Sequence, residues 1–145
     1  MIKRVLVVCI GNICRSPMAE AKLREALPEM HIYSAGLGAL VGKPADAIAT
    51  ELMSEAGLDI RQHRAQQLTN MLASQADMIF VMDSEQKREI QRRYPSASGK
   101  VFRLGEVGKF DIPDPYRQPR AAFEDALKLI QSGVDAWVPR IHALV

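Results

Sequence analysis

The sequence predicts an α/β fold, a three-layer sandwich in which helices flank a four-stranded parallel sheet. Short runs of β-branched and other apolar residues alternate along the chain with segments whose apolar residues recur at helical spacing. This alternation is typical of parallel strands joined by crossover helices. The 145 residues fit a single domain spanning 1–145, and a chain of this length can bury a core without disulfides or metal ions.

Local patterns indicate the first two strands and the helix between them. Residues 5–8 form a continuous apolar run, as expected of a strand that is buried on both faces. Ser16 and Pro17 suggest an N-cap followed by proline at the first helical position, and Pro28 ends that helix. Residues 32–35 form the second strand, which opens into a glycine-rich loop.

The middle of the chain contains two more helices and the third strand. Pro44 begins a helix that ends at Gly57, and residues 68–74 form a shorter one. Residues 78–82 form the third strand. The longer helix is expected to turn four apolar residues inward, namely Ile48, Leu52, Met53 and Ala56.

The last third of the chain supplies the fourth strand and two helices. Asp83 or Ser84 caps a charged helix that ends before Pro95, and residues 101–104 form the strand. A long helix follows, in which Pro139 predicts a kink or an early end. The apolar stripe of this helix comprises Phe123, Leu127, Ile130, Val134, Trp137, Ile141 and Leu144.

Charge and composition argue against several classes of protein. Nineteen Lys and Arg against seventeen Asp and Glu give a net charge of +2, too little and too evenly spread to indicate a nucleic-acid or membrane-surface partner. No apolar run has the length of a membrane span, and the amino terminus lacks the features of a signal peptide. The two cysteines cannot form a disulfide framework, which favours a reducing, cytoplasmic location.

The loop after the first strand is where we expect chemistry, because ligands bind beyond the carboxyl ends of parallel strands. The loop enters a helix, whose first N–H groups favour an anion. Gly11 can take a positive φ and Asn12 tolerates one, so the amides can curl into a phosphate-sized nest. Arg15 supplies a planar fork for two phosphate oxygens, and this positive cup favours the thiolate of Cys9. Ser16 can donate a hydrogen bond to that sulfur.

Each of these residues also has an ordinary structural interpretation. A cysteine that ends an apolar strand is usually a small buried side chain, Arg15 alone is most often a surface charge, and Gly11-Asn12 alone is a turn. Their conjunction between a strand and a helix favours a catalytic phosphate loop. A Walker-type loop is excluded because no Gly-Lys-Ser/Thr follows the strand, and a dinucleotide fingerprint is excluded because Gly11 is the only glycine in the turn.

The segment from Cys9 to Ser16 resembles the Cys-x5-Arg-Ser signature of the low-molecular-weight protein tyrosine phosphatases. The resemblance covers the whole chain, with Tyr33-Ser34-Ala35-Gly36 at the second strand and Asp114-Pro115-Tyr116 before the last helix. It implies strand order 2-1-3-4, a phosphate loop after strand 1, and hydrolysis of protein phosphotyrosine through a cysteinyl-phosphate with no metal or cofactor. The residues implied to surround the phosphate are Ile10, Gly11, Asn12, Ile13, Cys14 and Ser16.

A departing tyrosine needs a proton donor, and an Asp or Glu on a mobile loop is the usual provider. Asp111 and Asp114 are the candidates before the last helix. The residues alone do not separate them, since both fit turn positions beside prolines. The resemblance assigns the general acid to Asp114, the nucleophile to Cys9 and the phosphate clamp to Arg15.

The resemblance also implies supporting residues and a partner. Asn12 and Ser34 hold the phosphate loop by hydrogen bonds, and Leu40 and Tyr116 form apolar walls of a slot for a phenyl ring. Cys14 packs under the loop and can form a reversible disulfide with the nucleophile. An aliphatic residue at the position of Leu40 resembles the bacterial members of the family, which are paired with tyrosine kinases that control exopolysaccharide or capsule export. The implied partner is such an autophosphorylating kinase, and the expected state is a monomer or weak oligomer.

Each of four alternative functions can be compared with one feature of the sequence. An arsenate reductase of this fold needs two further cysteines, and none follows Cys14. A protein-arginine phosphatase carries threonine at the position of Ile13, whose apolar side chain favours an aryl phosphate. A binding module without turnover is disfavoured because Cys9, Arg15 and Asp114 are all present, and a nucleotide-binding domain because the glycine fingerprint is missing. No metal site is expected, since the histidines are scattered at His31, His63 and His142.

Overall fold

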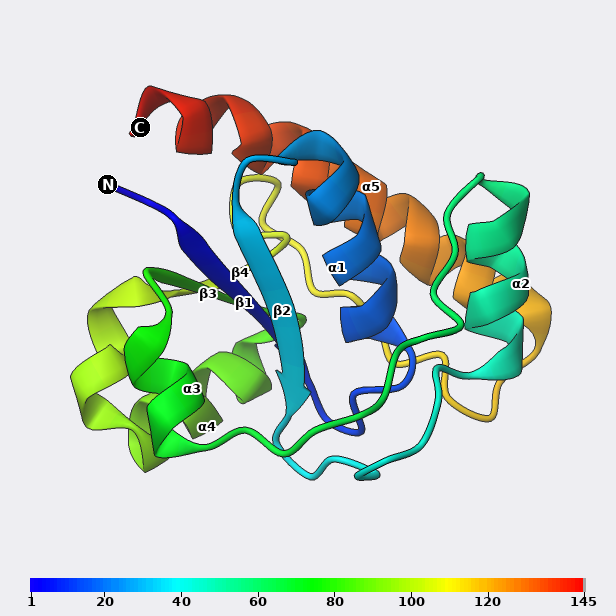
Figure 1. Ribbon diagram of the computed structural model, residues 1–145, viewed down its shortest axis with the longest axis horizontal. Helices are drawn as coiled ribbons and strands as arrows, with labels where there is room; N and C mark the ends of the chain where they lie inside the picture. The colour runs from blue at the N-terminus through cyan, green and yellow to red at the C-terminus, as the bar shows by residue number, and fades with distance from the viewer. Residues whose placement is uncertain (145) are drawn as a thin grey trace.

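The computed structural model describes residues 1–144, in which four parallel strands form a sheet between two layers of helices (Figure 1). β1 (Arg4–Cys9) and β3 (Met78–Val81) lie in the centre of the sheet. β2 (His31–Gly36) and β4 (Val101–Arg103) lie at its edges. The order β2-β1-β3-β4 and the parallel pairing confirm the predicted fold class.

Alternate side chains of β1 enter two different cores, which explains its unbroken apolar run. Val5 and Val7 pack into the core on one face of the sheet, and Leu6 and Val8 pack into the core on the other. All four are fully buried. One face is covered by α1 (Arg15–Ala26), α2 (Ala47–Glu55) and α5 (Arg120–Ala143), and the other by α3 (Asn70–Gln75), α4 (Ser84–Arg93) and the 3₁₀ helix η1 (Pro95–Lys100) (Figure 1).

Helix α1 starts earlier than predicted, because its first residue is Arg15 and its N-cap is Cys14. The predicted N-cap, Ser16, lies inside the first turn with Pro17. Its hydroxyl makes no capping bond and contacts the sulfur of Cys9 instead. The prediction of a serine cap is therefore wrong, since this hydroxyl serves the catalytic loop.

Helix α2 starts later than predicted. Pro44 lies in the preceding loop, and Asp46 caps the helix with a carboxylate oxygen 2.8 Å from the backbone nitrogen of Ile48. Gly57 follows the helix with a φ of 82°, as expected for a residue beyond a C-terminus. Leu52 and Met53 are buried, Ile48 is half-buried, and Ala56 is exposed, contrary to its predicted inward position.

The remaining elements match their predictions except at the ends. Thr69 caps α3 and Asp83 caps α4. Strands β3 and β4 each end one residue before the predicted last residue, and η1 was not predicted. Helix α5 continues through Pro139 to Ala143, so of the two predicted effects, a kink or an early end, the early end is wrong. Ile141 beyond the proline is fully buried, and its packing stabilises the last turns although one backbone hydrogen bond is lost.

None of the helices within residues 1–144 has both the length and the apolar character that crossing a membrane requires.

Candidate active site

A slot of about 150 Å³ lies at the carboxyl end of β1, where the sequence predicts the catalytic loop. Three separate segments form it: the loop after β1, the loop after β2, and the loop before α5. The slot therefore brings together Cys9 and Arg15 from one end of the chain with Asp114 from near the other. Its lining residues are Cys9, Ile10, Gly11, Ile13, Cys14, Arg15, Gly38, Leu40, Asp114 and Tyr116.

The backbone of the loop turns at Asn12, which has a φ of 59° in the left-handed region. Gly11, the other residue proposed for this conformation, does not have a positive φ. The loop also packs closely against the end of β2. A Cβ atom on Gly36 would lie 2.4 Å from the carbonyl oxygen of Ile10, so only glycine fits there. The shape of the loop thus depends on one asparagine and one glycine.

The nucleophile candidate Cys9 is buried and contacts a hydroxyl. Its Sγ lies 2.9 Å from Oγ of Ser16. Asn12 donates from Nδ2 to that Oγ at 2.7 Å and to Oγ of Ser34 at 3.0 Å. Its Oδ1 accepts from the backbone nitrogen of Gln66 at 2.9 Å, which fixes the orientation of the amide. The side chains of Asn12, Ser16 and Ser34 therefore lie behind the loop rather than in the slot.

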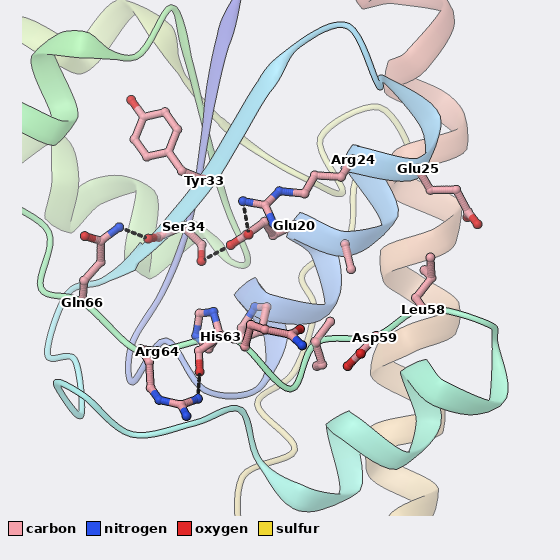
Figure 2. A pocket seen from close by; sticks show the side chains of 14 residues that line it. Glu20, Arg24, Glu25, Tyr33, Ser34, Leu58, Asp59, His63, Arg64 and Gln66 are labelled. Atoms are coloured by element: carbon pink, nitrogen blue, oxygen red, sulfur yellow. Dashed lines mark hydrogen bonds and ion pairs between the residues drawn. The ribbon is translucent and has the colours of Figure 1, made fainter.

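A second cavity, of about 500 Å³, lies behind this network between α1, β2 and residues 58–66 (Figure 2). At its edge Ser34 donates a hydrogen bond to Glu20, and Glu20 pairs with Arg24 at 2.8 Å. Gln66 donates to the backbone oxygen of Ser34 at 2.8 Å. These contacts hold Ser34 against the loop after β1, on the side away from the slot.

His63 also supports the loop, a role that the sequence did not suggest. Its Nε2 lies 2.6 Å from the carbonyl oxygen of Asn12. Because a carbonyl only accepts, Nε2 must carry the proton. No signal in the sequence identifies this histidine, since the contact depends on how residues 58–66 pass behind the loop.

Arg15 is almost fully buried and is held from the side away from the slot. Nη1 donates to the carbonyl oxygen of Ile112 at 2.7 Å and to Oδ2 of Asp83 at 3.3 Å. Nη2 lies 3.7 Å from Oδ2 of Asp114. Nε is buried and has no hydrogen-bond partner among residues 1–144. A buried donor without an acceptor is costly, so this guanidinium is built to receive one.

Asp111 and Asp114, which the sequence does not separate, occupy different places. Asp114 lines the slot and is about half exposed. Its Oδ1 accepts from the backbone nitrogen of Tyr116 at 3.1 Å. Asp111 points elsewhere, with Oδ1 3.0 Å from Nη1 of Arg103. The geometry therefore favours Asp114 as the group that reaches a substrate.

The remaining lining residues give the slot its apolar character. Leu40 and Tyr116 are exposed at its mouth, and Ile13 is largely buried. Cys14 is buried under the loop. Burial, reinforced by the negative charge of Asp46, raises the pKa of the Cys14 thiol far above its ordinary value. Cys14 therefore stays protonated at neutral pH and does not compete with Cys9 as a nucleophile.

In the part of the chain that the structure describes, no group of three or more His, Cys, Asp or Glu residues is arranged to hold a metal ion.

Comparison with known proteins places the chain among phosphatases. Residues 4–144 match the sequence profile of the "low molecular weight phosphotyrosine protein phosphatase". The chain is 65% identical over 144 residues to the probable low molecular weight protein-tyrosine-phosphatase EpsP of Ralstonia solanacearum, covering 99% of each protein.

Two solved structures are similar over nearly the whole chain. Vibrio vulnificus Wzb in complex with benzylphosphonate is 43% identical with a TM-score of 0.93, over 97% of this chain and 99% of that one. The YwlE arginine phosphatase of Geobacillus stearothermophilus is 32% identical with a TM-score of 0.91, over 97% and 94%. Together with the slot at the end of β1, these similarities establish that the chain belongs to the low molecular weight phosphotyrosine protein phosphatase family.

Proposed function

We propose that this enzyme hydrolyses phosphotyrosine in proteins through a cysteinyl-phosphate intermediate. The observation that carries the proposal is the unpartnered, buried Nε of Arg15, a residue that lines the same slot as Cys9. A phosphate monoester supplies the missing acceptor, since its oxygens match a guanidinium through two parallel hydrogen bonds. The same phosphate would bring its phosphorus atom to the nucleophile.

In the first step the thiolate of Cys9 attacks phosphorus, an S–P bond forms and the P–O bond to tyrosine breaks. Asp114 donates its proton to the departing phenolate oxygen. The hydroxyl of Ser16 stabilises the thiolate, and Arg15 with the loop amides stabilises the equatorial oxygens. The products of this step are tyrosine and the phosphocysteine.

In the second step a water molecule attacks the phosphorus of the phosphocysteine. The carboxylate of Asp114 takes a proton from that water, an O–P bond forms and the S–P bond breaks. Inorganic phosphate leaves and Cys9 returns as the thiolate. Apart from the substrate and water, both steps use only groups of the chain.

The walls of the slot favour an aryl phosphate. Leu40 and Tyr116 flank its mouth, and Ile13 places an apolar side chain beside the loop. Burial of a phenyl ring against these side chains is favourable, because apolar surface leaves water. A phosphoguanidinium in the same place would lose hydrogen bonds to water. These side chains therefore support phosphotyrosine over phosphoarginine, although the arginine phosphatase YwlE has a similar structure.

The relatives also support a biological setting. EpsP of Ralstonia solanacearum is by name a probable protein-tyrosine-phosphatase, and this chain is similar to it along its length. The aliphatic Leu40 at the slot adds the resemblance to bacterial family members that are paired with tyrosine kinases. We propose that its substrate is an autophosphorylating bacterial tyrosine kinase that acts in exopolysaccharide production or export. The cytoplasmic location and the monomeric or weakly oligomeric state stay predictions from the sequence.

The test is phosphate release from phosphotyrosine and phosphoarginine peptides, without added metal, by the wild type and Cys9→Ser. Release from phosphotyrosine alone, abolished in Cys9→Ser, is the expected result. Comparable release from phosphoarginine would overturn the substrate preference. If the protein releases phosphate from neither peptide but still binds the phosphopeptide, the result would favour a phosphotyrosine-binding module without turnover.

A further inference from the structure

Asp111 ties the loop before α5 to the start of α4, far away in sequence. Its Oδ1 lies 3.2 Å from the backbone nitrogen of Ser84, 3.3 Å from the Oγ of Ser84 and 3.0 Å from Nη1 of Arg103. Three donors from two elements thus converge on one carboxylate oxygen. A turn residue that only faces solvent would make no such contacts.

The start of α4 also holds the phosphate clamp. Asp83, directly before Ser84, accepts from Nη1 of Arg15 through Oδ2 and caps the helix through Oδ1 at 2.8 Å from the backbone nitrogen of Gln86. Two adjacent residues therefore reach the two halves of the site: Asp83 holds Arg15, and Ser84 holds Asp111.

A second carboxylate, besides that of Asp111, also holds the guanidinium of Arg103. Its Nη2 lies 3.1 Å from Oε2 of Glu106, and Glu106 pairs with Lys87 of α4 at 3.2 Å. The side chain of Arg103 is mostly buried, so its guanidinium has little freedom to leave the loop. This ion network spans β4, α4 and the loop that carries Asp114.

Beyond Ile112 the loop has few other attachments. Ile112 is fully buried, and its backbone nitrogen donates to Met82 at 2.8 Å. After it, a cavity of about 140 Å³ separates residues 113–115 from α5. Within the described residues, the backbone N–H groups of residues 113–119 that form hydrogen bonds do so only within this loop. Two contacts act at Asp114 itself, since Pro115 beside it is buried and Oδ2 of Asp114 lies 3.7 Å from Nη2 of Arg15. The point at which the loop leaves the sheet is set by the anchors that precede Asp114.

We infer that Asp111 is a positioning residue for the general acid: its bonds to Ser84 and Arg103 set where the loop leaves the sheet and hence where the carboxyl of Asp114 meets the leaving oxygen. This inference rests on the proposed role of Asp114. It gives Asp111 a task in phosphotyrosine cleavage without any contact to substrate.

The experiment compares Asp111→Asn with Asp135→Asn, the same change at an exposed aspartate of α5 whose carboxylate accepts a hydrogen bond from Gln131 at 2.8 Å. We measure kcat/KM, which covers the steps up to departure of the leaving group, for a phosphotyrosine peptide and for p-nitrophenyl phosphate. Tyrosine is a poor leaving group and needs the acid, whereas nitrophenolate leaves with less help. Asp111→Asn should lose about 10-fold on the peptide, because a small misplacement of a catalytic group is costly, and much less on the ester. Asp135→Asn should retain both activities.

The decisive comparison is Asp111→Asn in the Asp114→Asn background. If Asp111 acts through Asp114, the double variant should be no slower on the peptide than Asp114→Asn alone. An unchanged loss of about 10-fold in that background would overturn the inference, because the effect would then bypass the acid. Equal losses of Asp111→Asn on peptide and ester would overturn it as well.

Two further results keep the inference separate from the proposed function. If Asp114→Asn itself loses equally on both substrates, the acid role fails and the inference fails with it. If Asp114→Asn is selective and Asp111→Asn is not, only the inference fails. If Asp111→Asn does not fold, Arg103→Gln removes the same ion pair. We expect this variant to show the same selective loss on the peptide. If Arg103→Gln shows no selective loss, the inference is overturned.

Discussion

The side-chain amide of Asn12 donates a hydrogen bond to the hydroxyl of Ser16 at 2.7 Å. That bond occupies an acceptor position of the hydroxyl and leaves its hydrogen free to point at Cys9, whose sulfur is 2.9 Å away. The orientation of the asparagine amide thus decides which way the serine proton points. A thiolate at Cys9 meets a donor that is already in place.

Removing that donor should weaken catalysis. We expect Ser16→Ala to lower kcat/KM for a phosphotyrosine peptide by roughly 10- to 100-fold, because a hydrogen bond to a charged group contributes about 1.5–3 kcal/mol. Alkylation of Cys9 by iodoacetamide at neutral pH should slow as well, since the reacting sulfur loses its hydrogen bond to Ser16. Ser54→Ala, at an exposed serine of α2, is the control. Unchanged alkylation would show that Ser16 does not act on the sulfur.

Loss of the acid should depend on the leaving group. Asp114→Asn should lower kcat/KM for the phosphotyrosine peptide by roughly 10²–10⁴-fold, as expected when general acid catalysis is lost. The loss should be smaller for p-nitrophenyl phosphate, whose leaving group is a weak base. Steady-state rates with the two substrates measure the difference, and equal losses would argue against Asp114 as the acid.

Cys14 should protect the nucleophile against peroxide. Oxidation of Cys9 to the sulfenic acid, followed by condensation with the Cys14 thiol, would form a disulfide and water that a thiol reductant can reverse. Without Cys14 the sulfenic acid proceeds to irreversible forms. We expect Cys14→Ser to recover less activity than the wild type after peroxide followed by dithiothreitol. If both recover equally, Cys14 serves packing only.

The ion network around Glu106 predicts how stability changes with pH. The hydrogen bond from Arg103 lowers the pKa of Glu106 from 4.5 to about 2 in the folded protein. A folded-state pKa below the unfolded one stabilises the fold above the unfolded pKa, and this contribution disappears as the pH falls through the folded pKa. Glu106→Gln should therefore be less stable than the wild type at pH 7 and equally stable near pH 2.

Urea unfolding at several pH values between 7 and 2 measures this difference. Glu25→Gln is the control, since Glu25 is exposed and has no ion pair within residues 1–144. A free-energy difference for Glu106→Gln that stays constant over this range would contradict the assignment.

Gly36→Ala tests the close packing of β2 against the catalytic loop. The added methyl group would lie 2.4 Å from the carbonyl oxygen of Ile10, so the backbone must shift. We expect a loss of about 1–3 kcal/mol in the free energy of unfolding, as is typical of overpacking, together with reduced phosphatase activity. Gly99→Ala is the matched control, because a Cβ there meets nothing within 4 Å. Equal stability of the two variants would show that the loop can yield without cost.

The predictions from sequence are accurate where the signal is local. Strands buried on both faces leave continuous apolar runs, so residues 5–8 identify the central strand without any tertiary information. The segment from Cys9 to Ser16 carries its chemistry within one loop, and the structure places that loop at the predicted edge of the sheet. The parallel pairing of the strands follows from the alternation of elements, whereas the order 2-1-3-4 is what the family resemblance implies.

The errors arise where a side chain has a distant partner. Ser16 has the composition of an N-cap, but its hydroxyl binds Cys9 and Asn12 instead. Pro139 has the composition of a helix end, but burial of Ile141 outweighs the lost hydrogen bond. Tertiary contacts thus override local preference in both cases.

Supporting residues were missed for the same reason. Asp83 could be recognised only as a helix cap, and its contact with Arg15 requires β3 to lie beside β1. His63 contacts the backbone carbonyl oxygen of Asn12, and a contact to backbone leaves no pattern of residue types in the sequence. By residue type alone Asp111 and Asp114 look alike, as turn residues near prolines. The resemblance selects Asp114, and the positions of Arg103 and of the slot support that choice.

The central strand β1 is also the first strand to be synthesised, whereas both of its neighbours in the sheet follow it in the chain. Cys9 leaves the ribosome early, while Ile112, which holds Arg15, and Asp114 leave late. A nascent chain therefore carries the proposed nucleophile long before it contains the residues proposed to hold Arg15 and to protonate the leaving group. Translation itself delays the activity until the sheet is complete, and enzymatic activity reports on the completion of folding.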